Sequence, residues 1–168
     1  MTENKKYKSL EADELMKRMK NKEPLLLIDT LTGSHFEKVH LPGARSACVF
    51  EVTFLEQVEA IADGKNAEIV LYGSSDRSRD ALTAADKLQR EGYDNISVLN
   101  GGLEAWRARG FELQGDQPGM ADPETVLRLD DGQYRVDIDQ SVIEWSGRNP
   151  NSKHFGTVGI KEGQVKVN

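Results

Sequence analysis

The sequence predicts an α/β fold with a mainly parallel β-sheet that helices cover on both faces. Up to about residue 113, short apolar runs alternate with segments whose apolar residues recur at helical spacing. The apolar runs "LLLIDT", "EIVLY" and "NISVL" show no polar alternation, which is typical of strands buried on both faces. After residue 113 the pattern changes, and a C-terminal β-hairpin or meander segment is expected in addition.

The first expected helix follows Ser9, a residue type that often caps helix N-termini. Leu15 and Met19 mark its apolar face, and Glu11 and Asp13 suit the positive end of the helix dipole. The later elements alternate strictly between strand and helix. They are a strand at 25–30, a helix at 54–62, a strand at 68–72, a helix at 78–90, a strand at 95–99 and a short helix that ends near Gly110.

The chain divides by composition into three parts. Residues 1–115 form the α/β domain, residues 116–125 form a linker rich in Gly, Pro and acidic residues, and residues 126–168 form a β-rich segment. Asp131-Gly132 and Glu162-Gly163 are turn signals of the kind found in hairpins. About forty residues of meander are too few to bury a core of their own. We therefore expect this segment to pack on another surface or to belong to a longer domain.

Composition excludes several classes of partner and site. The net charge of -6 argues against nucleic acid or an anionic membrane as a partner. No apolar run approaches the roughly 20 residues that a membrane-spanning helix needs, and the N-terminus lacks the apolar region of a signal peptide. A cytoplasmic location is expected. A single cysteine, Cys48, excludes an internal disulfide and a Cys-rich metal site. We expect neither a metal nor a cofactor.

The segment "EIVLYGSSDRSRDAL" predicts a buried strand, a tight loop and a helix. In open parallel α/β sheets, ligands bind at the carboxyl ends of the strands, where such loops run into helix N-termini. The loop amides and the helix dipole favour an anion at this position, and an arginine side chain adds a guanidinium. The predicted binding residues are Gly73, Ser74, Ser75, Asp76, Arg77 and Ser78.

A cysteine in this loop would have its thiol pKa lowered by the same field and would become a nucleophile. The loop contains no cysteine. Ser74 and Ser75 are the hydroxyl-bearing residues at its tip, but the local sequence offers no neighbouring base, and serine is a preferred helix cap. We therefore expect these two serines to cap the following helix rather than to act as nucleophiles.

Outside the loop, Cys48 is the remaining candidate nucleophile. It lies in "HLPGARSACVFEV", at the expected end of a strand, where burial as a structural cysteine is the common outcome and where Arg45 would support a thiolate if the thiol were exposed. Three other residues have structural roles by the same reasoning. Asp29 is expected to cap or pair locally at a strand end, His40 to support the turn before Pro42, and Trp106 to lie in the core.

Three stretches, in this order along the chain, resemble the rhodanese-like sulfurtransferase domain. "LLLIDTLTGSHFEKVHLPGA" is similar to that family's strand–Asp…His-x-Pro-Gly-Ala segment, and "IVLYGSSDRSRDAL" is similar to its active-site strand, loop and helix. "VLNGGLEAWRARGFEL" resembles its closing Leu-x-Gly-Gly-x-x-x-Trp-x-x-x-Gly signature. The matching residues there are Leu99, Gly101, Gly102, Trp106 and Gly110. The resemblance spans about two thirds of the chain and implies a rhodanese-like fold.

The resemblance fails at the nucleophile. Active members have a Cys, four further residues and then Arg-Ser, and the Cys carries a persulfide sulfur. Alignment on Arg77-Ser78 puts Tyr72 at the Cys position, whereas alignment on the strand "IVLY" puts Gly73 there and leaves the loop one residue short. Leu31 also stands where the family usually has an Arg after the strand Asp. The resemblance therefore implies a domain that is inactive as a thiosulfate sulfurtransferase.

The C-terminal segment resembles the opening of a YceI-like domain, a lipocalin-like β-barrel family that binds polyisoprenoid or other lipids. The similar stretches are 134–137, 141–147 and 154–158. They correspond to the first strands of such a barrel, and a barrel has to close before it hides its edges and encloses a ligand. Lipid binding is therefore expected only if a complete barrel follows.

Three functions remain open at this point. The first is a binding or regulatory module whose loop binds a small anion or a sulfur-containing ligand. The second is a sulfurtransferase-type enzyme with a non-standard nucleophile such as Cys48. The third is a protein-docking module attached to a lipid-binding barrel, similar to phosphatase-associated rhodanese-like domains that lack the cysteine. An exposed apolar or charged patch at the mouth of the loop would favour the docking module.

Overall fold

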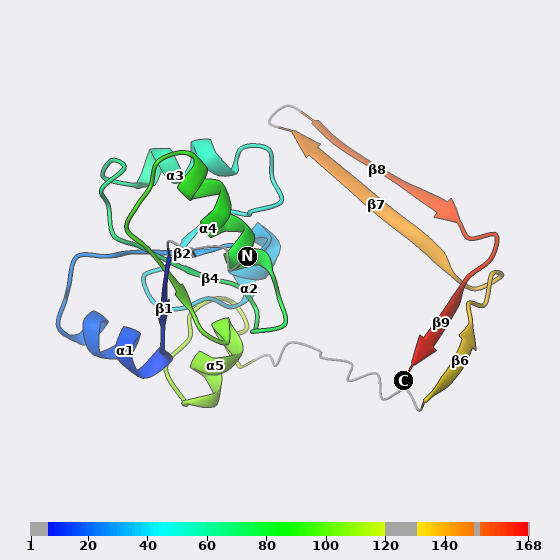
Figure 1. Ribbon diagram of the computed structural model, residues 1–168, viewed down its shortest axis with the longest axis horizontal. Helices are drawn as coiled ribbons and strands as arrows, with labels where there is room; N and C mark the ends of the chain where they lie inside the picture. The colour runs from blue at the N-terminus through cyan, green and yellow to red at the C-terminus, as the bar shows by residue number, and fades with distance from the viewer. Residues whose placement is uncertain (1–6, 120–130, 150–151, 168) are drawn as a thin grey trace, which may run out of the picture. The chain divides into compact units, whose positions relative to one another are not determined.

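The computed structural model describes residues 7–119, 131–149 and 152–167. The chain forms two compact units, residues 1–120 and residues 121–168. The first unit contains a sheet with helices, whereas the described part of the second consists of antiparallel strands (Figure 1).

The first unit is built on a five-stranded sheet with the strand order β1-β5-β4-β2-β3. Every neighbouring pair of strands is parallel. The three apolar runs of the sequence become β2, β4 and β5, and every residue of β4 and β5 is buried. The strands are β1 Lys8–Leu10, β2 Leu26–Asp29, β3 Arg45–Ser46, β4 Ile69–Tyr72 and β5 Ile96–Leu99.

Helices cover both faces of this sheet, which confirms the predicted α/β fold. Side chains alternate along β4: Ile69 and Leu71 pack with α3 and α4, whereas Val70 and Tyr72 pack with α1 and α5. None of the helices in the described ranges could span a membrane. The helices are α1 Ala12–Lys20, α2 Gly33–Lys38, α3 Phe54–Ile61, α4 Asp80–Arg90 and α5 Gly102–Ala108.

Two helices begin later than the sequence predicts. Ser9 does not cap α1, because it lies in β1 opposite Val98 and its hydroxyl donates to the side chain of Asn100. Pairing with the edge of β5 therefore outcompetes helix capping, and Glu11 is the N-cap of α1. The fourth helix begins at Asp80 rather than at residue 78, because the preceding residues form a loop.

The second unit contains two separate two-stranded antiparallel sheets. One pairs β6 (Gly132–Arg135) with β9 (Gln164–Val167), and the other pairs β7 (Val142–Asn149) with β8 (Ser152–Gly159). Neither predicted turn signal forms a hairpin turn. Gly132 is already the first residue of β6, and Glu162-Gly163 connects strands of different sheets. Residues 150–151, which connect β7 to β8, lie outside the described residues.

The N-terminus of α5 docks on the loop that follows β4. The amides of Leu103 and Glu104 donate to the carbonyl oxygens of Gly73 and Ser74, both at 2.9 Å. Helix N-termini carry such donors without intrahelical partners, so the loop satisfies two of them. Gly102 has a φ of +52°, and a Cβ at this residue would overlap the Gly73 carbonyl group, with the carbonyl carbon 2.9 Å away. Glycine at position 102 is therefore required for this close approach.

We expect Gly102→Ala to lower the free energy of unfolding by about 2 kcal/mol or more, because it combines a left-handed φ with a backbone overlap. Gly110→Ala is the matched control, since its φ of +68° is also left-handed but no atom lies within 4 Å of the added Cβ. The control substitution should lower the free energy of unfolding by only about 1 kcal/mol. Urea denaturation of both variants measures the difference, and equal losses would contradict the proposed overlap.

Candidate functional site

The candidate site is the loop at 73–79, which leaves the carboxyl end of β4 and enters α4. The structure therefore brings the six predicted binding residues together in one connection. Ser74, Ser75 and Ser78 are partly buried, whereas Asp76 and Arg77 are exposed. The predicted position at the carboxyl edge of a parallel sheet is found, and this edge is where open α/β sheets bind ligands.

One serine organises the junction between the loop and α4, but it is not one of the two predicted. The Ser78 amide donates to the Ser75 carbonyl oxygen at 3.2 Å. The Ser78 hydroxyl donates to the Asp80 carboxylate and accepts the Asp80 amide at 3.3 Å. The N-cap of α4 is Arg79, whose side chain makes no capping hydrogen bond. The prediction that Ser74 and Ser75 cap this helix is therefore wrong, because α4 begins only at Asp80 and Ser78 is the serine that binds in its first turn.

Three consecutive amides of the loop remain available. Among the residues that the structure describes, the amides of Ser74, Ser75 and Asp76 have no backbone acceptor. Successive amides without acceptors in a turn form a concave site that binds anions. Two carboxylates oppose this, because Asp76 lies in the loop itself and Asp80 occupies the first turn of α4. The loop thus combines hydrogen-bond donors for an anion with negative charges that weaken the local positive potential.

The geometry distinguishes between the two residues that align with the family's cysteine. Tyr72 is fully buried on the face of the sheet that α1 and α5 cover, and its hydroxyl accepts the Leu41 amide at 3.1 Å. A Cβ at Gly73 would instead face the loop, 3.4 Å from Ser78 Oγ and 3.4 Å from Asp80 Cβ and Oδ2. Gly73 therefore stands where a cysteine side chain would reach the loop, and Tyr72 belongs to the core.

A buried pair, Asp29 and Tyr72, lies directly beneath the loop, at register positions that face each other on β2 and β4. Burial raises the pKa of the Asp29 carboxyl, while the nearby Tyr72 hydroxyl and the Leu31 amide, which donates to Oδ1 at 2.8 Å, lower it by less. His35 and His40 lower this pKa further. Burial and then the Asp29 charge raise the pKa of Tyr72, so its hydroxyl stays protonated.

Sequence reasoning gave Asp29 a local capping role, and the Leu31 contact agrees with it. The pairing with Tyr72 was missed. Each of the two residues ends a buried apolar run, which the sequence shows. That they lie side by side can be seen only when β2 and β4 are known to be adjacent and in this register.

The structure does not bring Cys48 to the loop. Cys48 follows β3 and is only 5% exposed. β2 lies between β3 and β4, which separates these two strands by two inter-strand spacings of about 4.8 Å each. Structural burial is the outcome that the sequence suggests for this residue. His40 and Trp106 likewise make structural contacts: His40 Nδ1 lies 2.7 Å from the Phe36 carbonyl oxygen, and Trp106 Nε1 donates to the Glu112 carbonyl oxygen at 2.9 Å.

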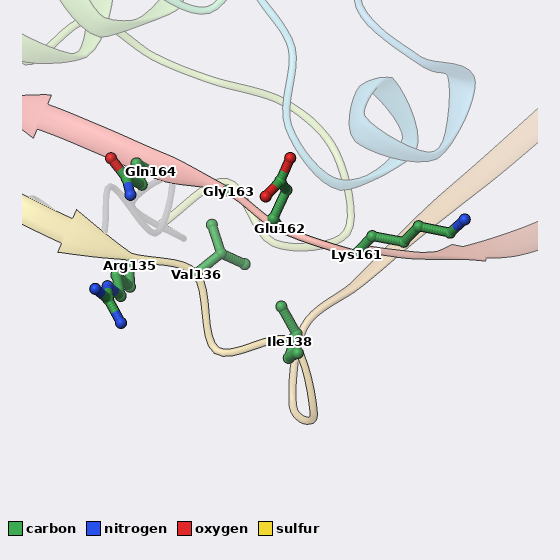
Figure 2. Close-up of a pocket in the computed structure, with 7 residues that line it drawn as sticks. All are labelled: Arg135, Val136, Ile138, Lys161, Glu162, Gly163 and Gln164. Carbon is green, nitrogen blue, oxygen red and sulfur yellow. The ribbon is translucent and has the colours of Figure 1, made fainter.

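The second unit has a cavity of about 720 Å³ beside the β6–β9 sheet. Val136 and Ile138 supply apolar lining, and Arg135, Lys161 and Glu162 supply charges. Figure 2 shows that the charged ends of these three side chains point in different directions. They do not converge on one ligand group. Among the residues that are described, no cluster of three or more His, Cys, Asp or Glu side chains is placed to hold a metal ion.

We expect Asp29→Asn to gain stability relative to the unmodified protein as the pH rises from 4 to 8. Folding raises the pKa of this carboxyl above its unfolded value of about 3.9, so its contribution to stability is full below that value and is lost as the pH passes the folded pKa. The asparagine does not ionise and avoids this loss. Urea denaturation at both pH values measures the difference, with the exposed Asp76→Asn as a charge-matched control. If the variant and the unmodified protein differ in free energy of unfolding by the same amount at both pH values, the raised pKa of Asp29 is contradicted.

Comparison with known proteins places this geometry in a family. The model of the rhodanese-like domain matches residues 11–109. No curated protein matches the chain significantly. Several solved structures share the fold of the first unit. The BH2092 protein from Bacillus halodurans has a TM-score of 0.62 at 23% identity, with 70% of this chain and 82% of that chain covered.

Two further structures extend the comparison. The Alr3790 protein from Anabaena sp. has a TM-score of 0.57 at 26% identity, covering 63% of this chain and 91% of that chain. The thiosulfate sulfurtransferase from Pseudomonas aeruginosa has a TM-score of 0.56 at 19% identity, covering 67% of this chain and 21% of that chain. The match of the family model, over more than half of the chain, decides the assignment: this chain belongs to the rhodanese-like domain family.

Proposed function

We propose that this rhodanese-like domain does not transfer sulfur from thiosulfate through a cysteine persulfide, and that it acts as a binding or regulatory module. The observation that carries the proposal is the glycine at position 73, where a side chain would face the loop. A persulfide requires a thiol at that position, and glycine has no side chain to carry one.

The loop at 73–78 is the proposed binding site, and its ligand is a small anion. The amides of Ser74, Ser75 and Asp76 without backbone acceptors support this role. The exposed Arg77 adds a guanidinium, which forms bidentate hydrogen bonds with oxyanions. Sulfate, phosphate and thiosulfate share this chemistry, so a sulfur-containing ligand remains within the class without any covalent step.

An enzyme with another nucleophile is the less favoured proposal. Cys48 is nearly inaccessible, and β2 separates its strand from the strand that leads into the loop. Ser74 and Ser75 are partly exposed, but a serine nucleophile needs a base within hydrogen-bond reach, and no such contact to a histidine is found among the described residues.

Protein docking is the second candidate function. It is favoured by Phe50 and Val52, which are 69% and 73% exposed on the loop between β3 and α3. This loop lies at the same carboxyl edge of the sheet as the anion-binding loop, because all five strands are parallel.

For the second unit, we propose a relationship to the first strands of a YceI-like barrel. The support is the sequence resemblance together with the antiparallel pairing of the described strands. Two open two-stranded sheets leave strand edges unpaired and Ile143 and Val158 half exposed. Lipid binding by this segment would require the remaining strands of a closed barrel.

We expect sulfate or thiosulfate to shift the amide NMR signals of Ser74, Ser75 and Asp76 when titrated into the full chain. Arg77→Met should weaken this response by about tenfold, because a charge-assisted hydrogen bond to an anion contributes roughly 1.5 kcal/mol or more. Arg79→Met removes the same charge from the last residue of the loop, outside the six proposed binding residues, and is the matched control. Equal weakening in both variants, or shifts spread over the whole domain, would indicate general charge attraction and contradict a site in the loop.

We expect Gly73→Cys to fit the loop but to react slowly with iodoacetamide at neutral pH. Asp80 Oδ2 lies 3.4 Å from the new Cβ, and this negative charge opposes a thiolate. Gly73→Cys combined with Asp80→Asn should react faster and show a lower thiol pKa. Peptide mass spectrometry gives the rates, and the buried Cys48 in the same chain is the internal reference. Fast reaction of the single variant would show that the amides and the helix dipole outweigh the carboxylate.

A further inference from the structure

The loop at 47–53, between β3 and α3, presents two large apolar side chains to solvent. Phe50 and Val52 have the highest exposed fractions among the large hydrophobic side chains whose burial is described, at 69% and 73%. The residues that border them, Val49 and Phe54, are both buried. Two apolar side chains held out next to a packed core are typical of an interaction surface.

Hydrogen bonds hold this loop in one conformation. The Val49 amide donates to the Thr30 carbonyl oxygen at 3.1 Å, and the Val49 carbonyl oxygen accepts Lys87 Nζ at 2.7 Å. The Phe54 amide donates to the Glu51 carbonyl oxygen at 3.2 Å. Because the backbone on both sides of the exposed pair is anchored, a partner would not have to order it, and little entropy is lost on binding.

Acidic residues outnumber basic ones around the pair, although Lys87 Nζ binds the Val49 carbonyl oxygen beside Phe50. Residues 46–64 contain four acidic residues and no Lys or Arg. Glu56 and Glu59 are exposed on α3, directly after the loop. Glu51 is partly buried, and its carboxylate accepts Gln57 Nε2 at 2.9 Å. Arg45 in β3 precedes this acidic stretch and Lys65 follows it, and both side chains are exposed. The surface therefore attracts positive charge.

We propose that Phe50, Val52 and the acidic outer face of α3 form a docking surface for a protein segment that presents apolar side chains flanked by Lys or Arg. A second copy of this chain is a poor occupant, because it would bring the same acidic residues opposite each other and the chain carries a net charge of -6. Nucleic acid and an anionic membrane are repelled for the same reason. This inference rests on the proposal that the domain docks another protein, and it names the chemical class of that partner.

The experiment selects binders from a phage library of random dodecapeptides against the full chain. The expected consensus contains Lys or Arg beside aromatic or aliphatic residues. Phe50→Ser combined with Val52→Ser should weaken the selected peptides at least tenfold, as should Glu56→Lys combined with Glu59→Lys. Val142→Ser combined with Ile143→Ser is the matched control, because these two side chains of β7 are 55% and 53% exposed.

Three outcomes would overturn the inference: no enriched peptide, a consensus without basic residues, or peptides that bind the variant of Phe50 and Val52 unchanged. Sedimentation that shows a dimer lost in this variant would also overturn it, because the occupant would then be a second copy. The anion response of the amides at 74–76 is the independent readout and should persist in all of these variants. If the amides do not respond to the anion while peptide binding is retained, the anion-binding loop is contradicted and the docking surface is not.

Discussion

The approach of α5 to the loop after β4 is the constraint on which the candidate site depends. Two amides of the helix N-terminus bind two loop carbonyls, and the absence of a side chain at Gly102 makes the distance attainable. This contact orients the carbonyls of Gly73 and Ser74 toward α5. The amides from Ser74 to Asp76 have no backbone acceptors among the described residues. Gly102, far along the chain, thus fixes the backbone from which these amides are presented.

The chemistry of the loop follows from what stands at its two ends. At its start, Gly73 has no side chain. The preceding residue, Tyr72, has its side chain buried in the core, and it pairs with Asp29 in the sheet. At its end, Asp80 places a carboxylate in the first turn of α4, where a ligand anion would otherwise find the positive end of the helix dipole. A thiolate would meet this carboxylate, whereas a hydrogen-bonded anion can bind at the amides earlier in the loop. This arrangement supports our proposal that the loop binds an anion reversibly and carries out no nucleophilic chemistry.

Most of the fold could be predicted from the sequence, because buried apolar strands and helical apolar stripes alternate regularly through the first unit. The errors occurred where local signals compete with tertiary contacts. Ser9 has the chemistry of a helix cap but extends the sheet edge. Ser74 and Ser75 lie in the loop before α4, which begins only at Asp80, so neither caps this helix. The sequence predicts that residues 73–78 connect a strand to a helix, and the structure has this connection, whereas their binding role stays a proposal. The choice between Tyr72 and Gly73 required the direction of each Cβ, which alignment does not provide. The exposure of Phe50 is likewise decided by how its neighbours pack.

One helix, α4, contacts both proposed surfaces, so their independence needs a physical reason. The loop enters α4 at Asp80, and two turns later Lys87 of the same helix binds the carbonyl beside Phe50. A shared element transmits binding between sites only if it has two arrangements of similar energy. The face of α4 that meets the sheet is lined by buried small residues, Ala81, Ala84 and Ala85, which allow close packing and leave little space for the helix to shift. We therefore infer that α4 holds one position, and that an anion at the loop leaves the docking surface unchanged.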